Sequence, residues 1–129
     1  IKFDPWFAQA YYNRGVCYTA LGEHGKALKA YTKAIKLAPE YAKAYSNRAK
    51  CYTNQGEHGK ALQDYTTAIE LDPKYAKAYY NKASTYALLG DIPQACHCLQ
   101  TAIEMDNKYL EMARTDKDFD AIRAAPCFQ

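Results

Sequence analysis

The chain has 129 residues, of which 49% are apolar and 24% are charged, and its formal net charge is +3 at pH 7. This length suits one domain with its own core, and this composition is ordinary for a globular protein. The sequence contains no run of about 18 apolar residues, so no transmembrane helix is predicted. It also shows no charged start followed by an apolar run, so no signal peptide is predicted. The mild positive charge does not by itself indicate nucleic-acid binding.

A unit of 34 residues recurs along the sequence, as three sets of identical residues show: Gly22, Gly56 and Gly90; Ala27, Ala61 and Ala95; Asn13, Asn47 and Asn81. A fixed period of about 20–50 residues predicts a stacked repeat protein. Residues 1–7 keep the same offset, because Ile1 precedes Ile35, and Pro5 precedes Pro39, by one period. We interpret residues 1–7 as the remnant of a preceding repeat and expect the chain to be a piece of a longer protein.

Each unit predicts two helices. The first helices are expected at 8–21, 42–55 and 76–89, and the second at 24–37, 58–71 and 92–105. In the middle unit Tyr45, Ala49 and Tyr52 recur at i, i+4 and i+7, which is a helical period. The glycine after each first helix suits a left-handed helix end. The predicted repeats are 8–41, 42–75 and 76–109.

The periodicity fades after the third repeat. Residues 107–114 predict one more helical stretch, and Thr115 is the expected N-cap of a short helix at 116–124. A terminal repeat needs a cap with a polar outer face. Residues 110–129 are therefore predicted to be C-terminal capping helices.

The spaced residues resemble the tetratricopeptide repeat. In the second unit they are Tyr45, Ala49, Tyr52, Gly56, Ala61, Tyr65, Ala68 and Pro73, and the first unit has Tyr11, Gly15, Tyr18, Gly22, Ala27, Tyr31, Ala34 and Pro39. The third unit departs from the pattern at Leu99 and Asn107. The resemblance implies an all-α, right-handed superhelical solenoid of antiparallel helix pairs. It also implies a concave groove, lined by the first helices, that binds peptides or partner proteins.

Polar residues mark the expected groove. On the middle first helix they follow one stripe at i, i+4, i+7 and i+11, formed by Lys43, Asn47, Lys50 and Asn54. The neighbouring first helices add Gln9, Tyr12, Asn13, Lys77, Tyr80, Asn81 and Ser84. Asparagine amides offer a donor and an acceptor, so a ladder of them would pair with a peptide backbone. The alternative is that these amides only suit a polar helix face or bond the adjacent repeat.

The lysines beside the ladder favour a ligand with acidic groups, unless they form only a solvated basic face. One subfamily of these repeats grips a chaperone's C-terminal carboxylate with lysines and asparagines on three first helices. Asn47 and Lys77 match two of its positions, but Tyr12 and Val16 replace its first Lys and Asn, and Asn81 replaces its last cation. The resemblance therefore does not carry this clamp over.

No catalytic or metal site is predicted. Cys96, His97 and Cys98 are adjacent on a helix and point in different directions, so no metal is expected there. The equivalent Cys17 and Cys51 are predicted to be small buried thiols in a reducing compartment. Arg48 is expected to reach a carboxylate such as Asp64, with direct ligand contact as its alternative role.

The sequence thus predicts a non-enzymatic interaction module without a cofactor, binding a protein or peptide rather than nucleic acid or membrane, in the cytoplasm. One alternative is a structural spacer, or a module that self-associates through Trp6 and Phe7 at its open N-terminal end. Another places catalysis in a further domain of a longer protein.

Overall fold

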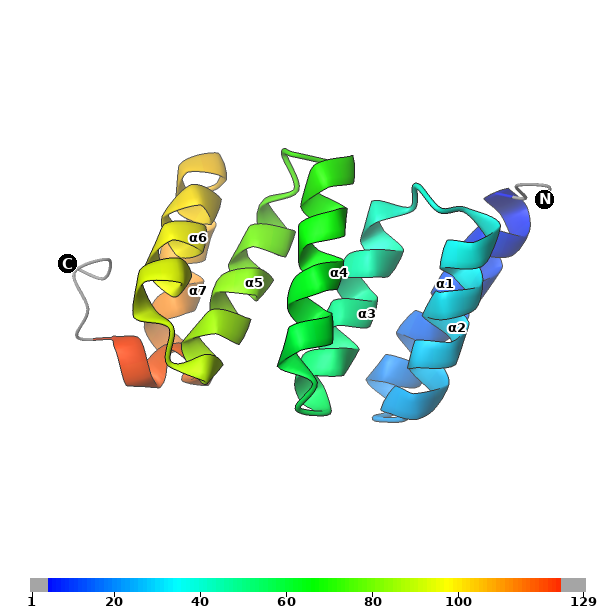
Figure 1. The fold of residues 1–129 in the computed structure, drawn as a ribbon, viewed down its shortest axis with the longest axis horizontal. Coiled ribbons are helices and arrows are strands. Elements are labelled where there is room, and N and C mark those ends of the chain that lie inside the picture. The colour runs from blue at the N-terminus through cyan, green and yellow to red at the C-terminus, as the bar shows by residue number, and fades with distance from the viewer. Residues whose placement is uncertain (1–4, 124–129) are drawn as a thin grey trace. The chain divides into compact units, whose positions relative to one another are not determined.

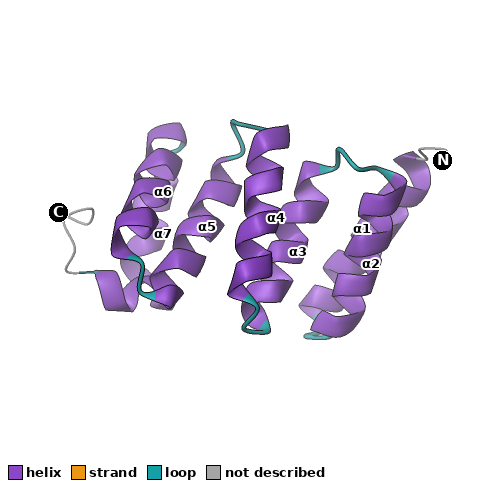
Figure 2. Cartoon of the chain, in the orientation of Figure 1, coloured by secondary structure: helices purple, strands orange, loops and turns teal. Residues whose placement is uncertain are grey.

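The computed structural model describes residues 5–123, which form seven α-helices and one 3-10 helix and contain no strand (Figures 1 and 2). The chain divides into two compact units, residues 1–73 and 74–129, and each is considered separately. No helix in residues 5–123 is long and apolar enough to cross a membrane.

The first unit contains two antiparallel helix pairs. The first pair is α1 (Pro5–Ala20) with α2 (His24–Leu37), and the second is α3 (Ala42–Asn54) with α4 (His58–Leu71). Figure 1 draws α2 in front of α1 and α4 in front of α3. Helix α1 begins three residues before the expected start, so residues 5–7, assigned from the sequence to the preceding repeat, continue this helix.

Within each pair, the first helix is joined to the second by the turn that the glycines predict. The φ angle of Gly22 is +76°, in the left-handed region, and those of Gly56 and Gly90 are +81° and +79°. After α1, the Glu23 amide donates to the Tyr18 carbonyl at 2.9 Å and the Gly22 amide donates to the Thr19 carbonyl at 3.0 Å. These two bonds form a Schellman motif, which satisfies the last carbonyls of α1 and ends the helix.

Small residues let the paired helices approach closely. Ala27 and Ala34 of α2 and Ala61 and Ala68 of α4 have no exposed surface. Gly15 of α1 faces the buried ring of Tyr31, and a Cβ atom at Gly15 would lie 2.5 Å from the ring carbon Cε1. The core of the first pair therefore requires a hydrogen atom at position 15, where the later repeats have alanine.

The second unit contains α5 (Ala76–Leu89), α6 (Ile92–Met105), α7 (Lys108–Thr115) and the 3-10 helix η1 (Lys117–Ile122). Leu99 of α6, Tyr109 of α7 and Phe119 of η1 belong to one buried cluster with residues of α5. Thr115 is the last residue of α7 rather than an N-cap. The N-cap of η1 is Asp116, whose side chain accepts from the Asp118 amide at 3.0 Å.

Of the two equivalent cysteines Cys17 and Cys51, one differs from the expectation. Cys51 is buried and free, as predicted, and its sulfur lies 3.5 Å from the Thr19 hydroxyl of the preceding repeat. The equivalent Cys17 is free but exposed. Cys51 of α3 is covered by the preceding first helix, α1. Cys17 lies on α1 itself, and no first helix precedes α1 among the described residues.

Candidate functional site

Polar side chains gather on one face of the first unit, formed by its two first helices, α1 and α3. We call this surface the first-helix face. Its exposed members are Gln9, Asn13, Lys43, Lys50 and Asn54, and its half-buried members are Tyr12 and Asn47. The buried residues of α3 are Ala44, Ser46, Ala49 and Cys51, which lie between the members of the polar stripe in the sequence. The helical period therefore places the polar stripe and the buried residues of α3 on different sides of the helix, as expected.

A chain of hydrogen bonds orients the amides on α1. The Tyr41 hydroxyl, at the start of α3, donates to Gln9 Oε1 at 2.9 Å. Gln9 Nε2 then donates to Asn13 Oδ1 at 3.0 Å, one helical turn away. Because the Asn13 carbonyl oxygen receives this bond, its amide nitrogen is the part that offers donors to a ligand.

The amide on α3 is oriented the opposite way. Asn47 Nδ2 donates to the Tyr12 hydroxyl at 3.0 Å, so its Oδ1 atom is the part that offers an acceptor. The Tyr12 ring is itself held in place, because it stacks on Tyr41 with centroids 4.9 Å apart and packs against Tyr31 at 5.9 Å. Burial raises the pKa of the Tyr12 hydroxyl above its ordinary value.

The first-helix face thus presents a donor at Asn13 and an acceptor at Asn47. A peptide backbone offers one acceptor and one donor per residue, so the two amides have the complementary polarity. Among the described residues no ion pair involves Lys43 or Lys50, and both ammonium groups are exposed. The face combines oriented amides with positive charge, and the bond from Asn47 to Tyr12 is the contact with the adjacent repeat that the sequence left open as the alternative role of these amides.

The second unit differs from the expectation. Tyr80, Asn81 and Ser84 of α5 are only 4%, 7% and 7% exposed. The Tyr80 hydroxyl donates to Asp116 Oδ2 at 2.7 Å, and the Ser84 hydroxyl donates to Asp118 Oδ2 at 2.6 Å.

These bonds mean that the C-terminal segment covers the groove positions of the last repeat. The Tyr80 ring also stacks on Tyr109 at 5.0 Å, and burial together with the Asp116 carboxylate raises the pKa of Tyr80. Of the α5 residues predicted to line the groove, only Lys77 is exposed. Sequence reasoning missed Asp116 and Asp118 as partners, because no repeat sets the register of the tail.

Arg48 has the structural role that the sequence favoured. Its Nε and Nη2 atoms donate to Asp64 Oδ2 and Oδ1 at 2.7 and 2.8 Å. Its Nη1 atom also donates to Thr32 Oγ1 at 3.3 Å, so the guanidinium joins α2, α3 and α4. The hydrogen bonds to Asp64 are the main cause that raises the pKa of Arg48. No group of three or more His, Cys, Asp or Glu within residues 5–123 is placed to hold a metal ion.

Antiparallel helix pairs with one turn geometry and one 34-residue period define an all-α helical-repeat solenoid. The chain belongs to the tetratricopeptide repeat family. One family model with this description matches residues 8–41 and 42–75, and a second matches residues 64–97. No curated protein sequence matches the chain significantly.

Several solved structures, two of them described as TPR domains, resemble the chain. The TPR2AB domain of yeast Sti1, in a complex with pHSP90, is 31% identical with a TM-score of 0.81, over 90% of this chain and 46% of that one. The Sgt2 TPR domain from Aspergillus fumigatus is 30% identical with a TM-score of 0.76, over 82% and 70%. MamA is 30% identical with a TM-score of 0.74, over 84% and 63%. The chain therefore spans less than two thirds of Sti1 TPR2AB and of MamA.

A further structure shows the fold alone. The first TPR of Spaghetti (RPAP3), bound to the HSP90 peptide SRMEEVD, has a TM-score of 0.80 but only 22% identity, over 92% of this chain and 89% of that one.

Proposed function

We propose that the chain is a non-enzymatic protein-interaction module whose first-helix face binds an extended peptide segment of a partner protein. The observation that carries the proposal is the opposite orientation of Asn13 and Asn47, set by their bonds to Gln9 and Tyr12. Oriented amides lose less rotamer freedom when a ligand binds than free ones would, so this arrangement favours affinity.

The comparison with yeast Sti1 supports a protein or peptide as the ligand, because that domain was solved in a complex with pHSP90. The ligand chemistry is expected to differ from a clamped terminal carboxylate. Tyr12 occupies the position of the first clamp lysine, and its hydroxyl accepts the amide of Asn47. Val16, which is 41% exposed, occupies the position of the first clamp asparagine and offers no hydrogen bond.

We infer that specificity comes from side chains around the amides. Lys43 and Lys50 flank Asn47 one turn on each side and would attract acidic residues of the peptide. Asn54, exposed at the end of α3, extends the polar stripe for further backbone contact. The peptide would thus be acidic and extended, and it would run across α1 and α3.

Two isosteric substitutions test the polarity of the amides on a peptide array. Asn13→Asp replaces the donors with an acceptor and should weaken binding about fivefold or more, since one hydrogen bond contributes about 1 kcal/mol. Asn47→Asp keeps the acceptor and adds the same charge, so it should weaken binding much less. Gln100→Ala, on the exposed surface of α6, is the control. Equal losses in the two Asp variants would refute the proposed polarity.

A second function is favoured by one observation. Trp6 and Phe7, in the first turn of α1, are 85% and 58% exposed. Two large exposed aromatic rings side by side in sequence are typical of a surface that contacts another protein, here a second copy of the chain. Light scattering of Trp6→Ser/Phe7→Ser tests this: self-association requires that the wild type is dimeric and the variant monomeric, and a monomeric wild type excludes it.

A further inference from the structure

Helix α2 carries an unusual set of charges on its solvent side. Its four lysines are all exposed and follow a helical stripe, and α2 contains no acidic residue. They are Lys26, Lys29, Lys33 and Lys36. Lys26 pairs with Glu23 at 3.3 Å, but no ion pair within the described residues involves the other three.

The second repeat does not share this stripe. At the positions 34 residues later, Lys29, Lys33 and Lys36 are replaced by Gln63, Thr67 and Glu70. The scaffold therefore does not require lysine at these positions, since α4 forms the same helix without them. Like charges spaced three or four residues apart on one helix repel one another, so Lys29, Lys33 and Lys36 destabilise α2 as neighbours. Only Lys36 gains from its position, in the last turn of the helix.

The stripe lies beside two pockets that belong to the first unit. One, of about 320 Å³, is lined by Leu28, Lys29, Thr32, Lys33 and Lys36 of α2. The other, of about 550 Å³, is lined by Tyr45, Arg48, Gly59, Leu62, Gln63, Asp64, Thr66 and Thr67 of α3 and α4. We call the surface formed by these two sets of residues the second-helix furrow.

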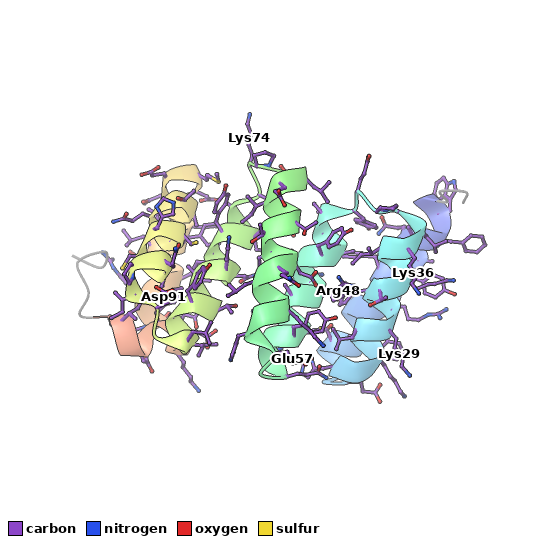
Figure 3. The ribbon with its side chains drawn as sticks, in the orientation of Figure 1. Lys29, Lys36, Arg48, Glu57, Lys74 and Asp91 are labelled. Carbon is purple, nitrogen blue, oxygen red and sulfur yellow. The ribbon has the colours of Figure 1, made fainter. Side chains whose placement is uncertain are left out.

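Arg48 joins the two parts of the furrow. It bonds Thr32 of α2 on one side and Asp64 of α4 on the other. Figure 3 shows Arg48 between α2 and α4, and Lys29 and Lys36 one above the other along α2. Because Arg48 is paired with Asp64, the net positive charge of the furrow comes from the three lysines on its α2 wall.

The furrow also offers apolar surface. Leu28, Tyr45 and Leu62 are half-buried, so each keeps part of its apolar surface open to solvent. Gly59, in the first turn of α4, has no side chain to fill the space above the neighbouring residues. A ligand that fits must combine carboxylates with apolar side chains.

We propose that the second-helix furrow is a second binding site, and that it holds an acidic amphipathic segment of a partner protein. Lys29 to Lys36 spans about 10 Å along α2, at 1.5 Å per residue. A partner helix with carboxylates at i, i+4 and i+7 has the same spacing and would meet the three ammonium groups one to one. Its apolar face would cover Leu28, Leu62 and Tyr45, as a helix packs into the groove between two others.

A protein segment fits this charge distribution better than a polyanion does. A nucleic acid or an anionic membrane presents negative charge over a wide area. The other wall of the furrow carries the neutral Gln63 and Thr67. Beyond this wall, α4 continues to the exposed acid Glu70, which is the repeat equivalent of Lys36. A wide negative surface would meet Glu70, whereas a short acidic segment meets only the α2 wall.

The test is the affinity of a fluorescein-labelled, helical, alanine- and leucine-based peptide with Glu at i, i+4 and i+7. The variant Lys29→Gln/Lys33→Thr/Lys36→Glu installs the residues of the second repeat, so it keeps a sequence that this fold already tolerates. We expect this variant to bind the peptide about tenfold more weakly, the combined effect of three exposed ion pairs. The same peptide with Gln in place of Glu should bind the wild type equally weakly.

A charge-matched variant at exposed positions of the second unit, Lys108→Glu/Lys117→Glu, changes the net charge by the same amount and should leave this affinity unchanged. Equal losses in both variants would show a non-specific charge effect and overturn the proposal, as would no loss in either. The wild type is also titrated with a single-stranded oligothymidylate and with phosphatidylserine vesicles. Tighter binding of either probe than of the acidic peptide assigns the furrow to that polyanion and overturns the assignment to a protein segment.

Discussion

The ion pair between Arg48 and Asp64 makes a quantitative prediction about stability. The two side chains are 17% and 9% exposed, and two bonds of 2.7 and 2.8 Å join them in a bidentate pair. Arg48→Ala leaves the Asp64 carboxylate buried without its cation, which costs about 3–5 kcal/mol. We expect this loss in the free energy of unfolding measured by urea denaturation followed by circular dichroism.

The first repeat supplies matched controls for this measurement. Arg14 and Ala30 stand 34 residues before Arg48 and Asp64, so Arg48→Ala/Asp64→Ala copies an environment in which no carboxylate needs a partner. The double variant should recover at least about 1 kcal/mol of the loss, because the unpaired buried charge is gone. Arg14→Ala, whose guanidinium is exposed above the Tyr11 ring at 5.0 Å, should cost about 1 kcal/mol or less. A cost below about 1 kcal/mol for Arg48→Ala, or no recovery in the double variant, would refute this reasoning.

Three further predictions concern packing, the C-terminal segment and thiol reactivity. Gly15→Ala should lower the free energy of unfolding by about 1–3 kcal/mol, because the added Cβ atom overlaps the buried Tyr31 ring. This loss outweighs the better helix propensity of alanine. A variant that is more stable in urea denaturation contradicts this. Tyr80→Phe should cost about 1–2 kcal/mol, because it removes the hydroxyl bond to a carboxylate at the N-terminus of η1; an unchanged unfolding midpoint contradicts this. The native protein is treated with iodoacetamide at pH 8, and mass spectrometry should find Cys17 modified well before Cys51. Burial shields the Cys51 thiol from the reagent and raises its pKa. Equal rates of modification at the two cysteines contradict this.

The 34-residue period predicted most of the helical architecture. The observed bounds of α2, α4, α5 and α6 are those expected from the sequence, because a left-handed glycine or a proline limits each helix. The bond from Arg48 to Asp64 was also predictable, since both residues fall on facing helices of one repeat. The expected start of the first helix was wrong by three residues, because residues 5–7 satisfy the helical pattern as well as the repeat offset.

The candidate site was less predictable, because position in a repeat does not specify the neighbours of that position. Tyr12 and Tyr80 are equivalent in the repeat, yet Tyr12 accepts from Asn47 whereas Tyr80 donates to Asp116. The difference comes from the next segment of the chain, which is a second repeat after Tyr12 and the non-periodic tail after Tyr80. The 3-10 geometry of η1 and its Asp116 N-cap likewise depend on contacts of the tail that no periodic signal encodes.

The central claim, that a peptide lies across α1 and α3 of the first unit, is tested most directly by a nuclear magnetic resonance titration. The ¹⁵N-labelled chain is titrated with the tightest-binding peptide from the array. The account predicts that the side-chain amide resonances of Asn13 and the backbone resonances around Lys43, Asn47 and Lys50 shift most. Shifts confined to α2 and α4, or to residues of the second unit, would contradict it.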